Sequence, residues 1–257
     1  MGPLPFATVG AGPPAVVLAG LTPTTGFDGR WSVLLTLGPM TSLADRRRLV
    51  AFNRRPGLPR GSTMATIAAE HADALRAGLG APVDVIGLST GGSIAQQLAA
   101  DHPDVVRRLV LVSTACRLSA VGRADQRRVA ARIRAGAQRQ ALALVCSDLV
   151  PTRTGRLSAA AIGWLLGPAL VGNHRDLDDM ATTIEAEDTF DLARCARPVS
   201  APTLILAGGD DRFYPPALLR ETAELIADSE LRVFPGRGHV TVMSDRGFLP
   251  ALTRFLE

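Results

Sequence analysis

The chain has 257 residues, of which 47% are hydrophobic and 20% are charged, and its formal net charge is +4. This is the composition of an ordinary globular protein, which excludes a disordered chain, and the length suits one large domain or a core with an insertion. All 28 basic residues are arginines. Chemistry that needs a lysine is therefore excluded, including a Walker A phosphate site and a Schiff base.

Short apolar segments rich in β-branched residues alternate with longer helical patterns along most of the chain. We predict strands at 14–20, 47–53, 83–89, 106–113, 202–209 and 230–236. We predict helices at 64–78, 91–102, 215–227 and 245–256. This alternation is typical of an α/β fold, in which a mostly parallel sheet is flanked by helices.

The segment Gly87-Leu88-Ser89-Thr90-Gly91 lies where the third predicted strand gives way to a helix. A Gly-x-Ser-x-Gly pattern arises by chance in roughly one chain in ten of this length and composition, so the pattern alone could be a tight turn with an incidental serine. Its position favours function, because this serine stands at the carboxyl edge of a central parallel strand, where ligands bind in open α/β sheets. We interpret Ser89 as a nucleophile on a strained elbow that requires small residues two positions away on either side.

The alternation of strands and helices stops in residues 116–198, where no strand-like run appears. Val129 and Ile133 belong to a helical stripe of apolar residues whose opposite face carries arginines. We therefore predict a helical cap at 116–198, inserted into a core of residues 1–115 and 199–257.

Residues 158–172 of this insertion are apolar nearly all round. A helix of that kind is normally buried, so we expect it to cover the cleft above Ser89. Trp164 and Leu165 should then line the substrate pocket.

A serine hydroxyl needs a base to become a good nucleophile, and the chain has four histidines. His71 lies on an apolar helix face, as a packing residue does, and His102 lies at a helix end. His174 lies in the insertion, where a surface position and a substrate contact are both open. His239 stands in a glycine-bracketed loop after the last predicted strand, and we expect it to be the base.

Two adjacent carboxylates, Asp210 and Asp211, follow the strand at 202–209. They could simply form the turn before the next helix. One of them could instead orient His239, and the chain order Ser, Asp, His is the order that hydrolases built on a strand–elbow–helix unit use.

With these motifs the chain resembles the α/β-hydrolase superfamily, in its cap-bearing branch, over essentially its whole length. The resemblance implies that Ser89 is the nucleophile and His239 the base. It also implies that Asp211 is the acid, because the family's acid lies three residues after a glycine at the end of its strand, here Gly208.

The resemblance further implies an oxyanion hole built from the backbone amides of Leu21 and Thr90. The chain departs from the family's pattern in three places. Ala19 stands where the family often has a histidine, the elbow reads Gly-Leu-Ser-Thr-Gly-Gly rather than Gly-His-Ser-Met-Gly-Gly, and Asn53 opens a loop that usually begins with an aspartate.

The motifs and the resemblance together predict a serine hydrolase that cleaves an ester, thioester or lactone of a small or medium, largely apolar substrate. Two alternatives stay open. The same triad serves carbon–carbon bond hydrolases and cofactor-free perhydrolases, and some relatives keep the triad mainly to sense a small molecule.

We expect no cofactor and no metal. The Asp-rich stretch 176–179 lacks the glycine and the terminal glutamate of a calcium loop, so it is read as a solvated turn. We expect a small-molecule substrate and no nucleic-acid partner, because no recognition motif accompanies the arginine clusters. No apolar run reaches about 18 residues and the N-terminus lacks a basic region, so we expect a cytoplasmic monomer or homodimer without membrane contact.

Overall fold

The computed structural model describes residues 4–27, 29–80, 82–150, 152–171 and 174–257, except for five side chains: Trp31, Arg153, Leu170, His174 and Arg175. Seven strands form one sheet in the order β1-β3-β2-β4-β5-β6-β7. The strands are β1 (Phe6–Val9), β2 (Pro14–Leu18), β3 (Arg48–Phe52), β4 (Val83–Leu88), β5 (Val106–Val112), β6 (Thr203–Gly208) and β7 (Ser229–Phe234).

All strand pairs are parallel except β1 with β3, so the predicted α/β class with a mostly parallel sheet is confirmed. Every residue of β4 and of β6 is buried, as expected for central strands covered by helices on both faces. Strand β1 was not among the predicted strands. This edge strand has only four residues, which alternate between exposed and half-buried, so its hydrophobic signal is weak.

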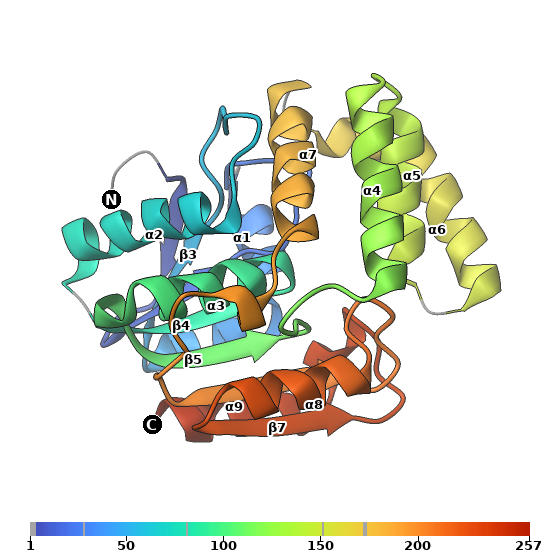
Figure 1. Ribbon diagram of the computed structural model, residues 1–257. Helices are drawn as coiled ribbons and strands as arrows, with labels where there is room; N and C mark the ends of the chain where they lie inside the picture. Colours follow the sequence, from blue (N-terminus) through green and yellow to red (C-terminus); the bar gives the residue numbers. More distant parts are fainter. Residues whose placement is uncertain (1–3, 28, 81, 151, 172–173) are drawn as a thin grey trace.

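Helices cover both faces of the sheet, and each face has its own apolar core (Figure 1). One face packs against α2 (Met64–Leu79), α3 (Thr90–Asp101) and α8 (Pro216–Leu225). The other packs against α1 (Gly29–Leu37) and α9 (Phe248–Leu256). Thr63 begins α2 by accepting a hydrogen bond at Oγ1 from the Thr66 amide over 3.2 Å, as an N-cap residue does.

Among the described residues, four α-helices lie between β5 and β6: α4 (Ala120–Arg134), α5 (Gln138–Asp148), α6 (Arg153–Leu166) and α7 (His174–Asp188). Short 3₁₀ helices occur at Gly38–Asp45, Pro103–Val105, Gly167–Leu170, Leu192–Arg194 and Thr241–Ser244. Figure 1 shows α7 standing between α2 and α4 above the sheet, with α5 and α6 beyond α4.

Helices α4, α5 and α7 share a third apolar cluster, separate from the two sheet cores, which includes Ile133, Leu142 and Ile184. The cluster explains why the apolar stripe of 116–198 forms helices that pack on one another. The division into a core and a cap with the boundaries given above stays a prediction.

The expectation for residues 158–172 is wrong in one respect, because α6 is not buried all round. Leu157, Leu165 and Leu166 are 72%, 62% and 60% exposed. Gly163 and Gly167 form the face that packs on α5, and a Cβ atom at Gly163 would lie 2.5 Å from the Leu142 carbonyl oxygen. Two glycines on one face therefore let α6 seat closely on α5, and its large apolar side chains project outward.

Within the described part of the chain, no helix has both the length and the apolar character needed to cross a membrane.

Candidate active site

Ser89 occupies the turn between β4 and α3. Its backbone has φ 50° and ψ −121°, a left-handed conformation that is unfavourable for a residue with a side chain. The Ser89 amide donates to the Val112 carbonyl oxygen over 2.9 Å, which ties the turn to the neighbouring strand β5. This is the strained elbow that the sequence predicts for residues 87–91.

The glycines of the elbow are there because the backbone around them is too close for a side chain. A Cβ atom at Gly91 would lie 2.2 Å from the Leu18 carbonyl oxygen, and one at Gly87 would lie 2.5 Å from the Cα atom of Gly92. Both neighbours are backbone, which cannot move aside cheaply. The elbow therefore depends on glycine on each side of Ser89.

Ser89, His239 and Asp211 form a hydrogen-bonded chain. The Ser89 hydroxyl lies 2.9 Å from Nε2 of His239, and Nδ1 of His239 lies 2.8 Å from Oδ2 of Asp211. The Asp211 side chain is fully buried and that of His239 is 10% exposed. A hydroxyl, an imidazole and a carboxylate in this order can activate the hydroxyl as a nucleophile.

Contacts around the imidazole fix its position. Oδ1 of Asp211 accepts hydrogen bonds from the amides of Phe213, at 2.9 Å, and Tyr214, at 3.3 Å. The rings of Phe213 and Tyr214 lie against His239, with centroids 5.0 and 5.9 Å away. The Ser113 hydroxyl donates to the His239 carbonyl oxygen over 2.6 Å. The base is thus held by both its backbone and its ring.

Leu21 and Thr90 line the same cavity as Ser89. Neither amide has a hydrogen-bond partner among the described residues. Thr90 is the first residue of α3, where backbone N–H groups have no intrahelical acceptor and the helix dipole favours negative charge. Two free donors beside a serine hydroxyl could stabilise an oxyanion that forms there.

The two residues that follow β3 donate hydrogen bonds to the loop that carries Leu21. The Asn53 amide group donates to the Thr24 carbonyl oxygen over 3.2 Å, and the Arg54 guanidinium donates to the Thr22 carbonyl oxygen over 2.7 Å. Asn53 stands where the family usually has an aspartate, and here its side-chain amide supports the Leu21 loop.

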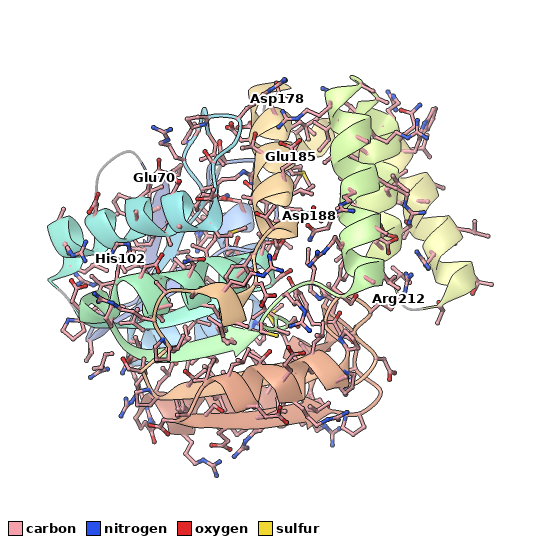
Figure 2. All side chains as sticks on the ribbon, viewed as in Figure 1. Glu70, His102, Asp178, Glu185, Asp188 and Arg212 are labelled. Carbon is pink, nitrogen blue, oxygen red and sulfur yellow. The ribbon has the colours of Figure 1, made fainter. Side chains whose placement is uncertain are left out.

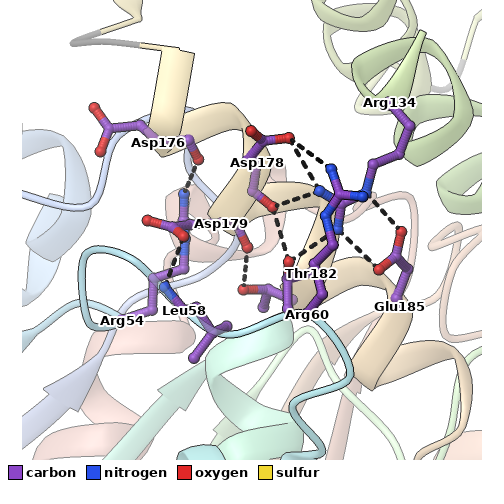
Figure 3. A network of polar contacts seen from close by, with 10 residues as sticks. Arg54, Leu58, Arg60, Arg134, Asp176, Asp178, Asp179, Thr182 and Glu185 are labelled. Atoms are coloured by element: carbon purple, nitrogen blue, oxygen red, sulfur yellow. Dashed lines mark hydrogen bonds and ion pairs between the residues drawn. The ribbon is translucent and has the colours of Figure 1, made fainter.

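Arg54 also connects this loop to the start of α7 (Figure 3). It is 4% exposed, and burial lowers its pKa to about 10 although Asp179 and Asp176 act in the opposite direction. Its guanidinium donates to the Asp176 carbonyl oxygen over 3.2 Å, and the Thr25 hydroxyl donates to the Asp176 carboxylate over 2.6 Å. The stretch 176–179 is therefore not a solvated turn, because it lies in the first turns of α7. Asp176 and Asp179 are buried, and the Asp179 carboxylate accepts hydrogen bonds from the Gly57 and Leu58 amides over 2.8 and 2.7 Å.

A cavity of about 620 Å³ opens above Ser89. The residues that line it are mostly apolar and come from the Leu21 loop, from α1, and from the helices between β5 and β6; they include Leu21, Leu35, Val129, Val145, Leu149, Val171 and Ile184. Helix α1 and its contribution to this wall were not among the sequence predictions.

Trp164 and Leu165 do not line this cavity, so the prediction for these two residues is wrong. They are 46% and 62% exposed, and the Arg139 guanidinium lies 4.9 Å from the centre of the Trp164 ring. The reason is the seating of α6 on α5, which leaves α5 and the segment after α6 facing the cavity, through Val145 and Val171.

The cavity wall also holds a buried carboxylate that the sequence analysis missed. Asp148 is 6% exposed, and burial, together with the nearby charge of Asp125, raises its pKa. The Arg156 guanidinium donates to it over 2.9 Å. No arginine occurs among the described residues that line the cavity. The described lining side chains therefore supply no permanent positive charge.

The described side chains of the other histidines, His71 and His102, lie away from Ser89. His71 is buried, with Nδ1 2.8 Å from the Ile67 carbonyl oxygen. His102 follows α3 and its ring lies beside Arg76, at the opposite end of that helix from Ser89 (Figure 2). The His174 side chain lies outside the described residues. Within the described residues no group of three or more His, Cys, Asp or Glu side chains could hold a metal ion.

The sequence matches the model of the alpha/beta hydrolase family over residues 15–249. It is 31% identical to the candidate carbamate hydrolase RutD of Klebsiella pneumoniae, over 91% of this chain and 87% of that protein. It is 29% identical to the pimeloyl-[acyl-carrier protein] methyl ester esterase of Chromobacterium violaceum, over 97% of this chain and 96% of that protein.

The fold is also similar to solved structures. The enol-lactonase of Burkholderia xenovorans superposes with a TM-score of 0.74, covering 98% of this chain and 96% of that one, at 22% sequence identity. At this level of identity the likeness concerns the fold.

Proposed function

The chain belongs to the alpha/beta hydrolase family and is an enzyme of that family, and we propose that it is a serine hydrolase of small or medium, largely apolar esters, thioesters or lactones. The observation that carries the proposal is the hydrogen-bonded chain from Ser89 through His239 to Asp211, with distances of 2.9 and 2.8 Å. The names of the relatives, which include an ester hydrolase and a lactonase, agree with this class.

In the proposed reaction the Ser89 oxygen attacks the substrate carbonyl carbon while Nε2 of His239 takes the hydroxyl proton. The tetrahedral intermediate collapses, and His239 gives that proton to the departing alcohol or thiol. Water then attacks the acyl-enzyme with His239 as base, which releases the acid and restores Ser89. Asp211 holds the imidazole in the tautomer that leaves Nε2 free to accept a proton, and it stabilises the imidazolium.

The amides of Leu21 and Thr90 are the proposed donors to the oxyanion. Neither amide has another partner in the described chain, so both are available without breaking an existing hydrogen bond. One preorganised donor of this kind contributes about 3–4 kcal/mol to the stability of the transition state in comparable sites.

The cavity supports a neutral acyl group as the preferred substrate. Its volume of about 620 Å³ suits a molecule of small to medium size. Asp148 is the carboxylate in its wall and no described lining residue is an arginine, so a substrate with a second carboxylate would lose hydration without gaining a cationic partner.

A fluorophosphonate probe tests the nucleophile. We expect one adduct per chain, located on Ser89 by peptide mapping, and no adduct in Ser89→Ala. The matched control is Ser113→Ala, because Ser113 also lines the cavity and also has φ 50°. That variant should still be labelled at Ser89. An adduct on Ser113 or Ser93 in the wild type would refute the assignment.

Turnover separates this proposal from its rivals. We expect the wild type to hydrolyse p-nitrophenyl esters with many turnovers per labelled site, and to prefer a neutral acyl chain to one of equal length that ends in a carboxylate. A sensing protein would bind such esters with at most stoichiometric release of p-nitrophenol. A preference for the carboxylate-terminated ester would contradict the proposed substrate class.

A further inference from the structure

Glu187, near the end of α7, is a buried carboxylate that the proposed reaction does not use. It is 0% exposed, and four neutral side chains donate hydrogen bonds to it. The donors are Thr90 at 2.8 Å, Ser93 at 2.7 Å, Tyr214 at 2.9 Å and Gln126 at 3.1 Å.

No ion pair joins Glu187 to an arginine in the described chain, although the sequence has 28 arginines. A buried carboxylate without a cation is costly, and only a full set of hydrogen bonds offsets the loss of water. A carboxylate has room for about four such bonds, and Glu187 receives four. Its other acidic neighbours on α7, Glu185 and Asp188, point toward the arginines of α4 instead (Figure 2).

Two of the four hydrogen bonds to Glu187 come from the helical turn that follows the nucleophile. Thr90 directly follows Ser89, and Ser93 lies one helical turn further along α3. Hydrogen bonds from both hydroxyls to one carboxylate fix the first turn of α3 against α7. Ser89 is the N-cap of that turn, and Thr90, whose amide is a proposed donor to the oxyanion, is its first residue.

A third hydrogen bond connects Glu187 to the base through Tyr214. Tyr214 donates its hydroxyl proton to Glu187, and its backbone amide donates to Asp211 over 3.3 Å. The ring between these two anchors is stacked on the His239 imidazole at an interplanar angle of 23°. Burial and the charge of Glu187 raise the Tyr214 pKa well above its usual value, so the phenol keeps the proton that it donates.

We propose that Glu187 is a positioning residue of the hydrolase: through Thr90 and Ser93 on one side and Tyr214 on the other, it holds the nucleophile and the base at hydrogen-bond distance. The inference rests on the proposed function of Ser89 and His239. Because Glu187 belongs to α7 and also binds Gln126 of α4 in the cavity wall, it ties the triad geometry to the helices that enclose the substrate.

The first test replaces Glu187 by glutamine, which keeps the shape but brings an NH₂ group to a site surrounded by donors. We expect kcat per labelled site to fall about 10- to 100-fold while KM changes less than about 3-fold, because reactive geometry and not substrate contact is lost. Labelling of Ser89 by a small fluorophosphonate should slow by a similar factor. Asp188→Asn is the matched control, since Asp188 is the next residue of α7 and pairs with Arg127. It should stay within about 2-fold of wild type.

The second test begins with a variant that leaves Glu187 in place, so its first measurement does not depend on whether Glu187→Gln folds. Tyr214→Phe keeps the ring on His239 and removes only the hydroxyl that reaches Glu187, and we expect kcat to fall about 3- to 10-fold. In a double-mutant cycle the Tyr214→Phe change should cost little in the Glu187→Gln background, because both changes break one connection. Full wild-type kcat in folded Tyr214→Phe, or additive losses in the cycle, would overturn the proposal.

A third readout needs no turnover. The Nδ1 proton of His239 bonded to Asp211 should give a far-downfield proton resonance, which Glu187→Gln should broaden or shift and Asp188→Asn should not. An unchanged resonance in Glu187→Gln would contradict the positioning role. Absence of Ser89 labelling in the wild type would contradict the proposed hydrolase function instead, so the two failures are distinguishable.

Discussion

Oδ2 of Asp211 lies 2.8 Å from Nδ1 of His239, whereas the preceding residue, Asp210, is exposed to solvent. Asp211→Asn should therefore lower kcat by about 10⁴-fold, because an amide at this position favours the wrong imidazole tautomer. The same substitution at Asp210 should leave kcat within about 2-fold of wild type. Steady-state kinetics of the two variants decide between them, and a larger loss in Asp210→Asn would show that the acid is misassigned.

Glycine at position 91 should be indispensable for steric reasons. A Cβ atom there would lie 2.2 Å from the Leu18 carbonyl oxygen and 2.5 Å from that of Ala19. Gly91→Ala must push the end of β2 away from the elbow, and we expect it to lower the free energy of unfolding by about 3 kcal/mol and to displace Leu21.

Gly136→Ala is the matched control for that substitution. Gly136 has φ +72° but no atom within 4 Å of its Cβ position, so alanine there should cost only about 1 kcal/mol of backbone strain. Urea unfolding of both variants measures the difference. Equal losses in the two would mean that the contact at Gly91 relaxes without cost.

Stability should fall in mild acid because of His71. Burial lowers the pKa of this imidazole, whose ring packs edge-on against Phe52. The unfolded chain therefore takes up a proton near its ordinary pKa of about 6.5 while the folded chain stays neutral. The stabilising contribution is present above that pH and is lost as the pH falls toward the folded pKa, by at most about 1.4 kcal/mol per pH unit.

His71→Leu should flatten this dependence. Urea unfolding at pH 7.5 and at pH 5.0 gives the drop in unfolding free energy for each protein, and the drop should be about 1–2 kcal/mol smaller in the variant. The same drop in both proteins would contradict a neutral, buried imidazole.

The parts of the molecule that the sequence predicted are those coded by neighbouring residues. The elbow is a local pattern around Ser89, and the six predicted strands are apolar runs whose burial needs no knowledge of distant contacts. Glu187 shows the limit of such reasoning. Its partners Thr90 and Tyr214 lie 97 and 27 residues away in the sequence. Nothing in the sequence next to Glu187 indicates that its carboxylate will be buried.

Helix α6 shows a second limit. Its apolar composition predicted burial, but burial of a helix depends on which face finds a partner. Gly163 and Gly167 form the face that packs on α5, and the leucines on the other side stay exposed. The orientation of α6 depends on the close contact of Gly163 with the Leu142 carbonyl oxygen and of Gly167 with the Leu142 side chain, and that contact requires the structure of α5.

Because α5 and not α6 faces the cavity, the acyl-chain length that the enzyme accepts should depend on α5. Val145 of α5 lines the cavity, and Trp164 of α6 does not. Val145→Phe fills part of the roughly 620 Å³ space, so kcat/KM should fall for long acyl chains by about 10-fold or more and stay nearly constant for acetate esters. A panel of p-nitrophenyl esters from two to ten carbons measures the profile. Trp164→Ala should leave that profile the same as in the wild type, because the Trp164 ring lies against Arg139 of α5 and does not line the cavity. If Trp164→Ala shifted the preference toward longer chains and Val145→Phe did not, the acyl pocket would lie under α6 and the cavity assigned here would be the wrong one.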